Sequence, residues 1–409
     1  MAPKNMDDVQ QSTALRLTAL AICVVVFLLA CCPPALGQSC DLACPPEGRE
    51  LVPCGPAFDV CLDVRAEYLL WWTDGMDVPA LVTTSPNGTA RDQAGVLGQP
   101  NTAILYGGTA LNGDAHSGGR FAVGGWFDDC RTLGFELGYT FLEQDGATYT
   151  ASSQGNPILA RPFVNADTGL QDAGLVAYPN VAQGSLTIDA ATQFHTAEAL
   201  LTKPLWEGCG PRVVMLLGYR YALLEDDLRM TEAMVSRETS TVGSTLDLFD
   251  QFTTKNTFNG PQLGLLTERQ CGVWTIQLLT KVALGSVHSE VTVDGSTTTK
   301  TTTGASATTA GGFYALPTNI GTYEQDKFSA LTELGLKLSC DIDCHWRASI
   351  GYSFLYWHCA ARAGDQIDTM LSAGEFPPGQ GSASLHPQFP FNTSAFWAQG
   401  LNFGVECRF

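Results

Sequence analysis

Large apolar side chains recur at every second position in a series of segments from residue 59 to the end of the chain. In Leu133–Phe141, for example, the odd positions are large and apolar and the even positions are small or polar. A period of two residues places successive side chains on opposite faces of a β-strand. The pattern predicts ten strands, at 59–73, 119–127, 132–145, 187–205, 211–229, 252–268, 273–292, 323–340, 345–360 and 394–409.

The connections between these strands alternate between short and long without exception. Outer-membrane barrels show this asymmetry, with short periplasmic turns and long extracellular loops. The sequence therefore predicts an all-β fold over 59–409, a single ten-stranded antiparallel transmembrane β-barrel with five long extracellular loops and four short periplasmic turns. The short connections are 128–131, 206–210, 269–272 and 341–344, and the long ones are 74–118, 146–186, 230–251, 293–322 and 361–393.

The N-terminus has the features of an export signal. An apolar run, Leu17–Cys32, ends at two prolines and is followed by the small residues of Ala35–Gly37. We interpret 1–37 as a cleaved signal peptide, followed by a Cys- and Pro-rich periplasmic segment at 38–58. The run is short for a membrane anchor, and a lipid anchor on Cys31 is the other alternative.

Charge and composition narrow the class of protein further. The formal net charge is −19, and removal of 1–37 leaves it unchanged because that segment has two basic and two acidic residues. Such a chain is a poor partner for nucleic acid, which requires basic patches. We expect a protein of the bacterial outer membrane, with its lipid as a partner and no cofactor or metal.

The polar face of the predicted strands carries ionisable residues that would point into the barrel. Ten strands enclose a bore that side chains can largely fill, and unpaired charges inside it would be costly. The two interpretations are a plug of paired charges, which we favour, and a selective pore. The strand phases assign to this network Asp63, Arg65, Glu67, Glu136, Arg220, Lys281, Glu333, Lys337, Arg347 and Glu406.

Ten cysteines fall at the predicted periplasmic side, in the N-terminal segment, in or beside the turns, or near the C-terminus. The periplasm is oxidising, so we expect disulfides among them, with a zinc site in the N-terminal segment as the alternative. Cys359, near the extracellular rim, is the predicted free thiol. The ten are Cys40, Cys44, Cys54, Cys61, Cys130, Cys209, Cys271, Cys340, Cys344 and Cys407.

The last strand ends in a terminal aromatic residue that is in phase with its apolar face. Phe403, Val405 and Phe409 are typical of the C-terminal strand by which the barrel-assembly machinery recognises its substrates. We therefore expect that machinery to be a partner.

Several segments resemble a family of outer-membrane β-barrel proteins that is abundant in planctomycete genomes. The most distinctive are Ala315–Gly321 (ALPTNIG) and Gly351–Trp357 (GYSFLYW), with Ala66–Trp72, Gly364–Asp368 and Phe396–Leu401 in support. The resemblance runs from about residue 60 to the end. It implies an outer-membrane barrel and no catalytic residues.

Functional expectations follow from these features. The favoured role is structural or in cell-surface interaction, with an extracellular ligand or partner of unknown identity and without enzymatic activity. A narrow channel for small solutes or ions is the first alternative. A surface hydrolase at the rim is the second, and its candidate residues are His116, His288 and His358 with Asp114, Glu290 and Asp365.

Two loop segments differ in character. The stretch Thr297–Thr309 is rich in Thr and Ser, and we expect it to be mobile. Ala315–Gly321 contains Pro317 and Gly321 beside apolar residues, which favours an ordered turn that folds over the mouth of the barrel.

Overall fold

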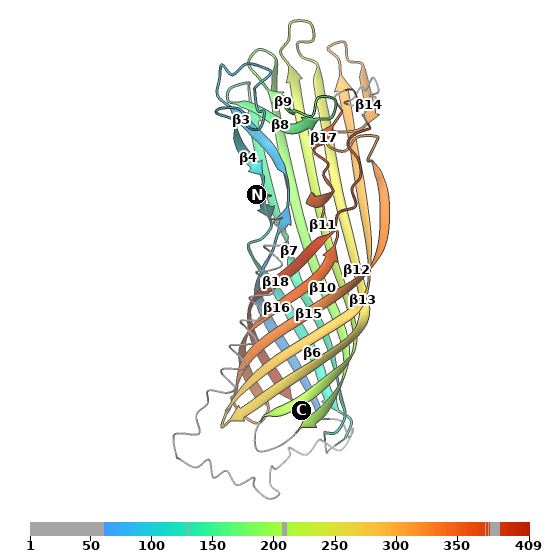
Figure 1. Ribbon diagram of the computed structural model, residues 1–409. Coiled ribbons are helices and arrows are strands. Elements are labelled where there is room, and N and C mark those ends of the chain that lie inside the picture. Colours follow the sequence, from blue (N-terminus) through green and yellow to red (C-terminus); the bar gives the residue numbers. More distant parts are fainter. Residues whose placement is uncertain (1–60, 129–130, 207–210, 373, 375, 377–384) are drawn as a thin grey trace, which may run out of the picture. The chain divides into compact units, whose positions relative to one another are not determined.

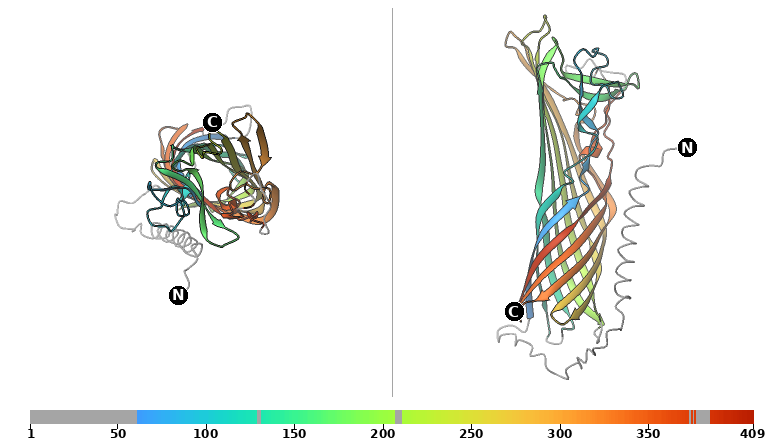
Figure 2. Two further views of the ribbon diagram at one scale, coloured as in Figure 1. Left: turned by 90° about the horizontal axis from the view of Figure 1, so that it is seen from above. Right: turned by 90° about the vertical axis from the view of Figure 1, so that its left-hand side faces the viewer.

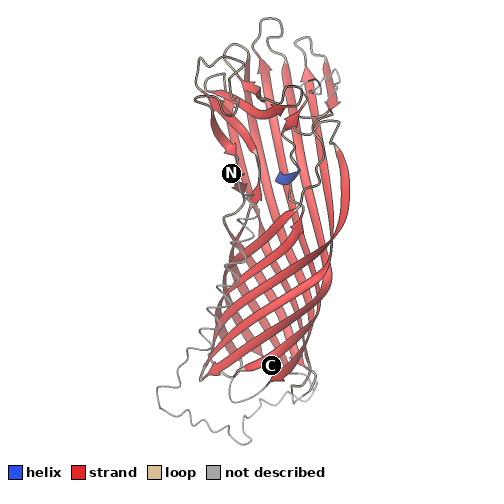
Figure 3. Cartoon of the chain, viewed as in Figure 1, coloured by secondary structure: helices blue, strands red, loops and turns tan. Residues whose placement is uncertain are grey.

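The computed structural model describes residues 61–128, 131–206, 211–372, 374, 376 and 385–409, all of which belong to one compact unit, Cys54–Phe409. The predicted signal peptide and the segment 38–58 lie outside the described residues. The described chain is built of strands, with one short 3₁₀ helix, η1 (Gly364–Gln366) (Figure 3). None of its helices has the length and apolar character needed to cross a membrane.

Ten long antiparallel strands are each hydrogen-bonded to two neighbours. Followed around, the pairings run β1-β6-β7-β10-β11-β12-β13-β15-β16-β18 and return to β1, so they close a ring (Figures 1 and 2). An eleventh strand, β14, pairs only with the far end of β13. The strands are β1 (Cys61–Thr73), β6 (Ala115–Trp126), β7 (Gly134–Ser153), β10 (Ala182–Trp206), β11 (Arg212–Ser236), β12 (Thr245–Cys271), β13 (Trp274–Lys300), β14 (Ser306–Ala310), β15 (Gly321–Asp341), β16 (Trp346–Ala360) and β18 (Ser394–Arg408).

Because the ring is antiparallel, its short connections gather at one end and its long connections at the other. We call these the short-turn end and the long-loop end. At the short-turn end the observed strand boundaries are close to the predicted ones. At the long-loop end, β7 and β10–β13 extend well beyond the predictions 132–145, 187–205, 211–229, 252–268 and 273–292.

The strands extend further than predicted because their apolar residues move from one face of the strand to the other part-way along. On β11, Leu217 and Tyr219 point outward and are about half exposed, whereas Arg220 beside them is only 2% exposed. Further along the same strand Leu228 and Met230 are buried on the inner face. The period of two continues, but the apolar face moves from outside to inside, which in the sequence resembles the end of a strand.

The long-loop half of the ring is filled by the connections themselves. They form a five-stranded sheet, β17-β8-β3-β4 with β9 paired to β8, and a small two-stranded sheet, β2-β5. Their apolar residues pack against the inner faces of β10–β13 in one hydrophobic core. These strands are β2 (Met76–Asp77), β3 (Ala80–Ser85), β4 (Ala103–Gly107), β5 (Ala110–Leu111), β8 (Ile158–Asn165), β9 (Gln171–Ala177) and β17 (Met370–Leu371).

The Thr- and Ser-rich stretch forms the β13–β14 hairpin. Ala315–Gly321 is an ordered turn, and Leu316 and Asn319 within it are fully buried. The side-chain amide of Asn319 donates to the carbonyl of Tyr314, and its oxygen accepts the backbone N–H of Leu316. This one side chain closes the turn in both directions.

Candidate functional site

Charged side chains from seven strands meet on the inner face of the short-turn half. Several of their contacts are chords across the ring, which join strands that are not neighbours. Arg220 on β11 reaches Glu333 on β15, with Nη1 2.7 Å from Oε2. Lys337 on β15 contacts Glu67 on β1, and Lys281 on β13 contacts Glu198 on β10. These chords join separate walls of the ring through ion pairs.

Glu333 takes part in two of these cross-ring contacts. Besides Arg220, it accepts a hydrogen bond of 2.8 Å from Nη2 of Arg120 on β6. Arg120 also lies 3.6 Å from the carboxylate of Glu67, and its guanidinium covers the ring of Trp71 at 5.5 Å. Glu333 and Arg220 are each 2% exposed. Two arginines thus hold one buried carboxylate inside the ring.

The other predicted charges lie nearer the short-turn end. Arg65 on β1 pairs with Asp63 and with Glu136 on β7. Arg347 pairs with Asp341 across the β15–β16 turn, with Nε 2.6 Å from Oδ1. Glu406 accepts from Arg408 two residues later, at 2.7 Å. Each of the ten residues assigned by strand phase therefore has an ion-pair partner, although Arg347 and Glu406 pair locally at the rim.

Two members of the cluster were missed by the sequence analysis. Arg120 follows the same inward phase as Ala122 and Gly124, and the outward residues Phe121 and Val123 carried that signal. Glu198 lies in an Ala-rich part of β10, where small residues on both faces conceal the phase.

The charges enclose one small cavity of about 80 Å³. Its lining includes Arg65, Glu67, Arg120, Glu198 and Lys281. The lining also includes leucines such as Leu216 and Leu279. A space of this size suits a few water molecules, bound to the charged groups, rather than a solute.

An apolar layer lies directly above the charges, toward the long-loop end. It is built from inward-facing residues of most strands of the ring, and its largest side chains are Trp71, Trp357, Phe194, Phe258 and Phe396. Phe194 and Phe396, from β10 and β18, approach to 5.4 Å between ring centroids, and Phe258 meets Trp357 edge-on at 6.0 Å. The layer crosses the bore, because these strands lie on different sides of the ring.

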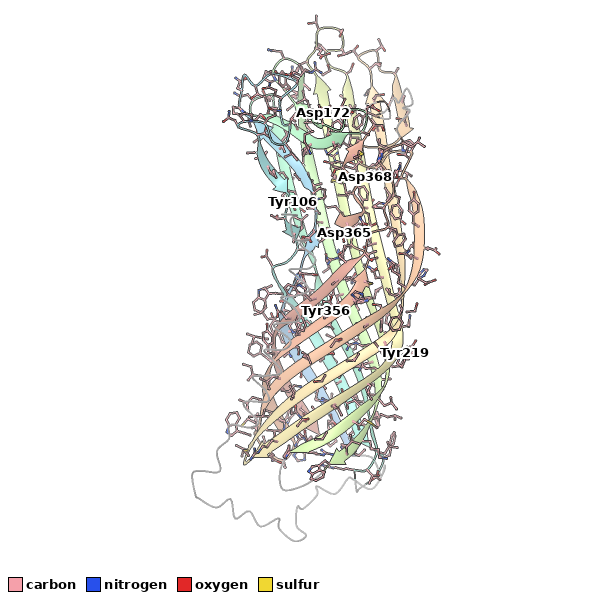
Figure 4. The ribbon with its side chains drawn as sticks, viewed as in Figure 1. Tyr106, Asp172, Tyr219, Tyr356, Asp365 and Asp368 are labelled. Atoms are coloured by element: carbon pink, nitrogen blue, oxygen red, sulfur yellow. The ribbon has the colours of Figure 1, made fainter. Side chains whose placement is uncertain are left out.

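Above that layer, the chain after β16 turns into the bore. The side-chain amide of Asn256 on β12 exchanges hydrogen bonds with both backbone groups of Ala361, at 2.7 and 2.8 Å. Arg362 pairs with Asp226 on β11, with Nε 2.6 Å from Oδ2, and with Asp74 after β1 at 3.3 Å. Asp365 lies in this segment, higher in the molecule than Tyr219 on the wall (Figure 4).

A second buried ion cluster anchors two loops to the long-loop half. Arg161 on β8 donates to Asp250 on β12 at 2.9 Å and lies 3.6 Å from Glu232 on β11. The other oxygen of Asp250 accepts three successive backbone N–H groups, those of residues 313–315, at 2.7–2.9 Å. Burial raises the pKa of Glu232 from its usual 4.5 to about 7; Arg161 opposes the rise and Asp250 adds to it.

Five cysteines have described side chains, and all five are free thiols: Cys271, Cys340, Cys344, Cys359 and Cys407. Cys40, Cys44, Cys54, Cys130 and Cys209 lie outside the described residues, as does the side chain of Cys61. The predicted disulfides that involve these six therefore stay predictions.

The histidines proposed for a rim hydrolase are separated. His116 is buried inside the ring, where Nε2 lies 3.1 Å from the carbonyl oxygen of Asn112. His288 is on the outer face and pairs with Asp326 at 3.0 Å rather than with Glu290. Asp365 accepts from Ser394 at 2.7 Å. His116 and His288 therefore lie on opposite faces of the wall and do not share one site.

A closed ring of antiparallel strands with an apolar outer face and ion pairs inside is the architecture of porin-type β-barrels. Residues 64–409 match the family described as "Putative beta barrel porin-7 (BBP7)". The chain belongs to this family of porin-like outer-membrane β-barrels.

Several solved structures are similar at low levels. The outer membrane protease OmpT from Escherichia coli is 8% identical with a TM-score of 0.40, covering 85% of this chain and 97% of that one. A major outer membrane protein from Thermus thermophilus is 10% identical with a TM-score of 0.23, covering 86% and 99%. An anion-selective porin from Comamonas acidovorans is 8% identical with a TM-score of 0.21, covering 86% and 99%. Similarity this low carries no argument about function. No curated protein matches the chain.

Proposed function

We propose that this chain is a ten-stranded transmembrane barrel with a filled lumen, which holds an ordered layer of loops at the cell surface. Its role is structural or in surface interaction, without enzymatic activity. The observation that carries the proposal is the set of chords through Glu333, which join β6, β11 and β15 across the bore.

The outer face supports a membrane-spanning half. On β11 the outward residues are apolar from Val213 to Tyr221, and polar residues such as Glu225 and Asp227 follow. A tilted strand needs about 9–11 residues to cross the hydrocarbon core. Since neighbouring strands change in the same way, the apolar outer face of the short-turn half forms a belt of suitable height for lipid contact.

The inner face supports a filled lumen. Paired charges occupy the bore, and an apolar layer crosses it immediately above. Water and ions cross an apolar constriction poorly, because it offers no partner to replace their hydration. Two successive barriers of different chemistry would both have to open for steady conduction.

The long-loop half supports the surface role. Its loops are tied down by buried ion pairs, Arg161 with Asp250 and Arg362 with Asp226, rather than left loose. Ordered loops on a rigid scaffold are a common basis for recognition. The same end would face outward from the cell, with the short turns and the ten cysteines predicted at that side in the periplasm.

The remaining expectations from the sequence belong to this proposal. Residues 1–37 act as a cleaved signal, and the barrel-assembly machinery recognises the last strand. Phe403, Val405 and Phe409 are exposed, and Phe403 and Val405 lie on the outer face of β18.

A narrow channel is the second candidate, and the small cavity among the charges favours it. Planar-bilayer recordings of the purified protein separate the two functions. A filled lumen predicts no steady conductance for the natural protein. Replacement of Phe258 and Trp357 by alanine should then produce openings, because it removes part of the apolar layer. The matched control replaces Phe328 by alanine, since this side chain is 73% exposed on the outside. Large, steady conductance of the natural protein would favour the channel.

A further inference from the structure

The turn between β15 and β16 brings three potential metal ligands together. Asp343, Cys344 and His345 are consecutive and exposed, and their ligand atoms all lie within 4.8 Å of one another. Sγ of Cys344 is 3.1 Å from Nδ1 of His345. Neighbouring side chains on a regular strand point to opposite faces, so this convergence depends on the turn.

The turn is held by backbone contacts that leave the ligand atoms accessible. One carboxylate oxygen of Asp343, Oδ1, accepts the backbone N–H groups of His345 and Trp346, both at 2.8 Å. Ile342 donates to the carbonyl of Trp346 at 2.9 Å, and Arg408 on the last strand donates to the carbonyl of His345 at 2.8 Å. The backbone that carries the three side chains is therefore held in place by hydrogen bonds within the turn and by one from the neighbouring strand β18.

We propose that Asp343, Cys344 and His345 form a binding site for a divalent ion of the zinc class at the short-turn end of the barrel. A thiolate and an imidazole are the ligands that zinc prefers, whereas calcium and magnesium prefer oxygen ligands alone. One thiolate and one carboxylate would also neutralise the charge of a divalent ion.

The geometry is close to that of a bound ion. Zinc lies about 2.3 Å from sulfur and about 2.0 Å from nitrogen, so tetrahedral coordination separates these atoms by about 3.6 Å. The observed 3.1 Å requires a small outward movement of two exposed side chains. Three protein ligands would leave one position open, where a water molecule or a periplasmic partner completes the shell.

The neighbouring charges do not oppose the ion. Arg347 pairs with Asp341, and Arg408 pairs with Glu406 and with Asp341. Both guanidinium groups thus have carboxylate partners of their own. If the proposed topology is right, the site faces the periplasm, and Cys344 is a metal ligand rather than a member of the predicted disulfides.

Cobalt(II) is a suitable probe for this site, because a thiolate–cobalt bond produces a charge-transfer absorption band. The full-length protein is purified in detergent, reduced, freed of metal and titrated with cobalt and then with zinc. We expect one equivalent of cobalt to produce the band and zinc to abolish it. Cys344→Ser should remove the band. His345→Ala should weaken zinc binding by at least about tenfold, because loss of a mere hydrogen-bond partner of a zinc ligand already costs about 10–100-fold and His345 is a direct ligand.

Two controls keep the result specific. Cys271→Ser changes an exposed thiol at the end of β12, beside the preceding short turn, and should leave binding intact. Asp343→Asn retains an oxygen for the backbone N–H groups, so it tests the charged ligand without breaking the turn. The titrations are made on protein in which Cys40, Cys44, Cys54 and Cys61 are replaced by serine, because these could also bind cobalt. A band that survives Cys344→Ser in that protein would overturn the proposal. So would mass spectrometry that finds Cys344 in a disulfide in protein isolated without reductant. Neither result would affect the barrel itself.

Discussion

Arg220 and Glu333 form an ion pair of 2.7 Å inside the ring, although β12 and β13 separate the strands that carry them. The pair therefore joins two separate parts of the ring across its interior and is not a contact between adjacent strands; we call it a brace. Since both side chains are buried, each depends on the other for its charge to be tolerated.

Loss of this brace should destabilise the barrel. Removing one partner of a buried ion pair costs about 3–5 kcal/mol, because it leaves the other charge without compensation. We expect Arg220→Met to lower the free energy of unfolding by about 3 kcal/mol, at the lower end of that range, since Arg120 still compensates Glu333 in part. Urea unfolding in lipid vesicles measures this.

The control for that variant is Lys255→Met, which removes a surface pair with Glu225 of 3.3 Å. Exposed pairs contribute about 0–1 kcal/mol. Equal effects of the two substitutions would show that the interior pair does not brace the wall.

The membrane belt predicts that the cost of an arginine on the outer face of β11 depends strongly on its position along the strand. Leu217 and Thr231 both point outward from β11, but only Leu217 lies in the apolar belt. Leu217→Arg should cost about 2–4 kcal/mol, the known range for arginine near the bilayer midplane. Thr231→Arg should be close to neutral. Folding yield into vesicles and urea titration check both, and a similar penalty at both positions would contradict the placement of the belt.

The Glu232 carboxyl predicts a pH dependence of the loop layer. Its pKa is raised by burial to about 7 in the folded protein, so the folded state favours the protonated form. Stability from this group is therefore present at low pH and is lost as the pH rises from about 4.5 through 7. We expect hydrogen exchange in β8 and β9, corrected for the intrinsic effect of pH on exchange, to show less protection at about pH 8 than at about pH 5.

Glu232→Gln should remove that difference, because a neutral amide cannot ionise. Glu238→Gln is the matched control, since Glu238 pairs with Arg91 on the exposed surface. If the protection of β8 and β9 keeps the same pH dependence in Glu232→Gln, another group is responsible.

Topology can be tested on intact cells. Epitope tags inserted in 74–118 and 361–393 should be accessible to antibody, and a tag in 206–210 should not. A tag between β12 and β13, at Gly272, provides a second position at the short-turn end. The reverse labelling would contradict the orientation.

Much of the architecture is readable in the sequence, because the outer face of the short-turn half alternates cleanly. The positions of Arg220, Glu333 and Lys337 on the inner face follow from that phase alone. What the sequence does not show is which charges meet, since chords between distant strands depend on the stagger of the whole ring. Arg120, central to the cluster, was missed although it lies within the predicted strand 119–127 and in phase with Ala122 and Gly124.

The long-loop half was harder to predict for a physical reason. Phe252 and Leu228 are as regularly spaced as the residues of the membrane belt, but they face inward. An inward orientation of these apolar residues can be predicted only if the inside of the ring is known to be filled. The loops themselves fill it. Residues such as Tyr314 resemble loop residues in the sequence, although this side chain is fully buried.

The change of apolar face along β10–β13 divides the molecule into two halves with opposite solvent requirements. The short-turn half has its apolar face on the outside, and it needs lipid or detergent around it to stay folded. The long-loop half buries its apolar face in a core of its own, as a water-soluble protein does. Detergent exchange should therefore disturb the first half, and mild denaturant or pH the second, so one continuous set of strands should lose its structure in two separate steps.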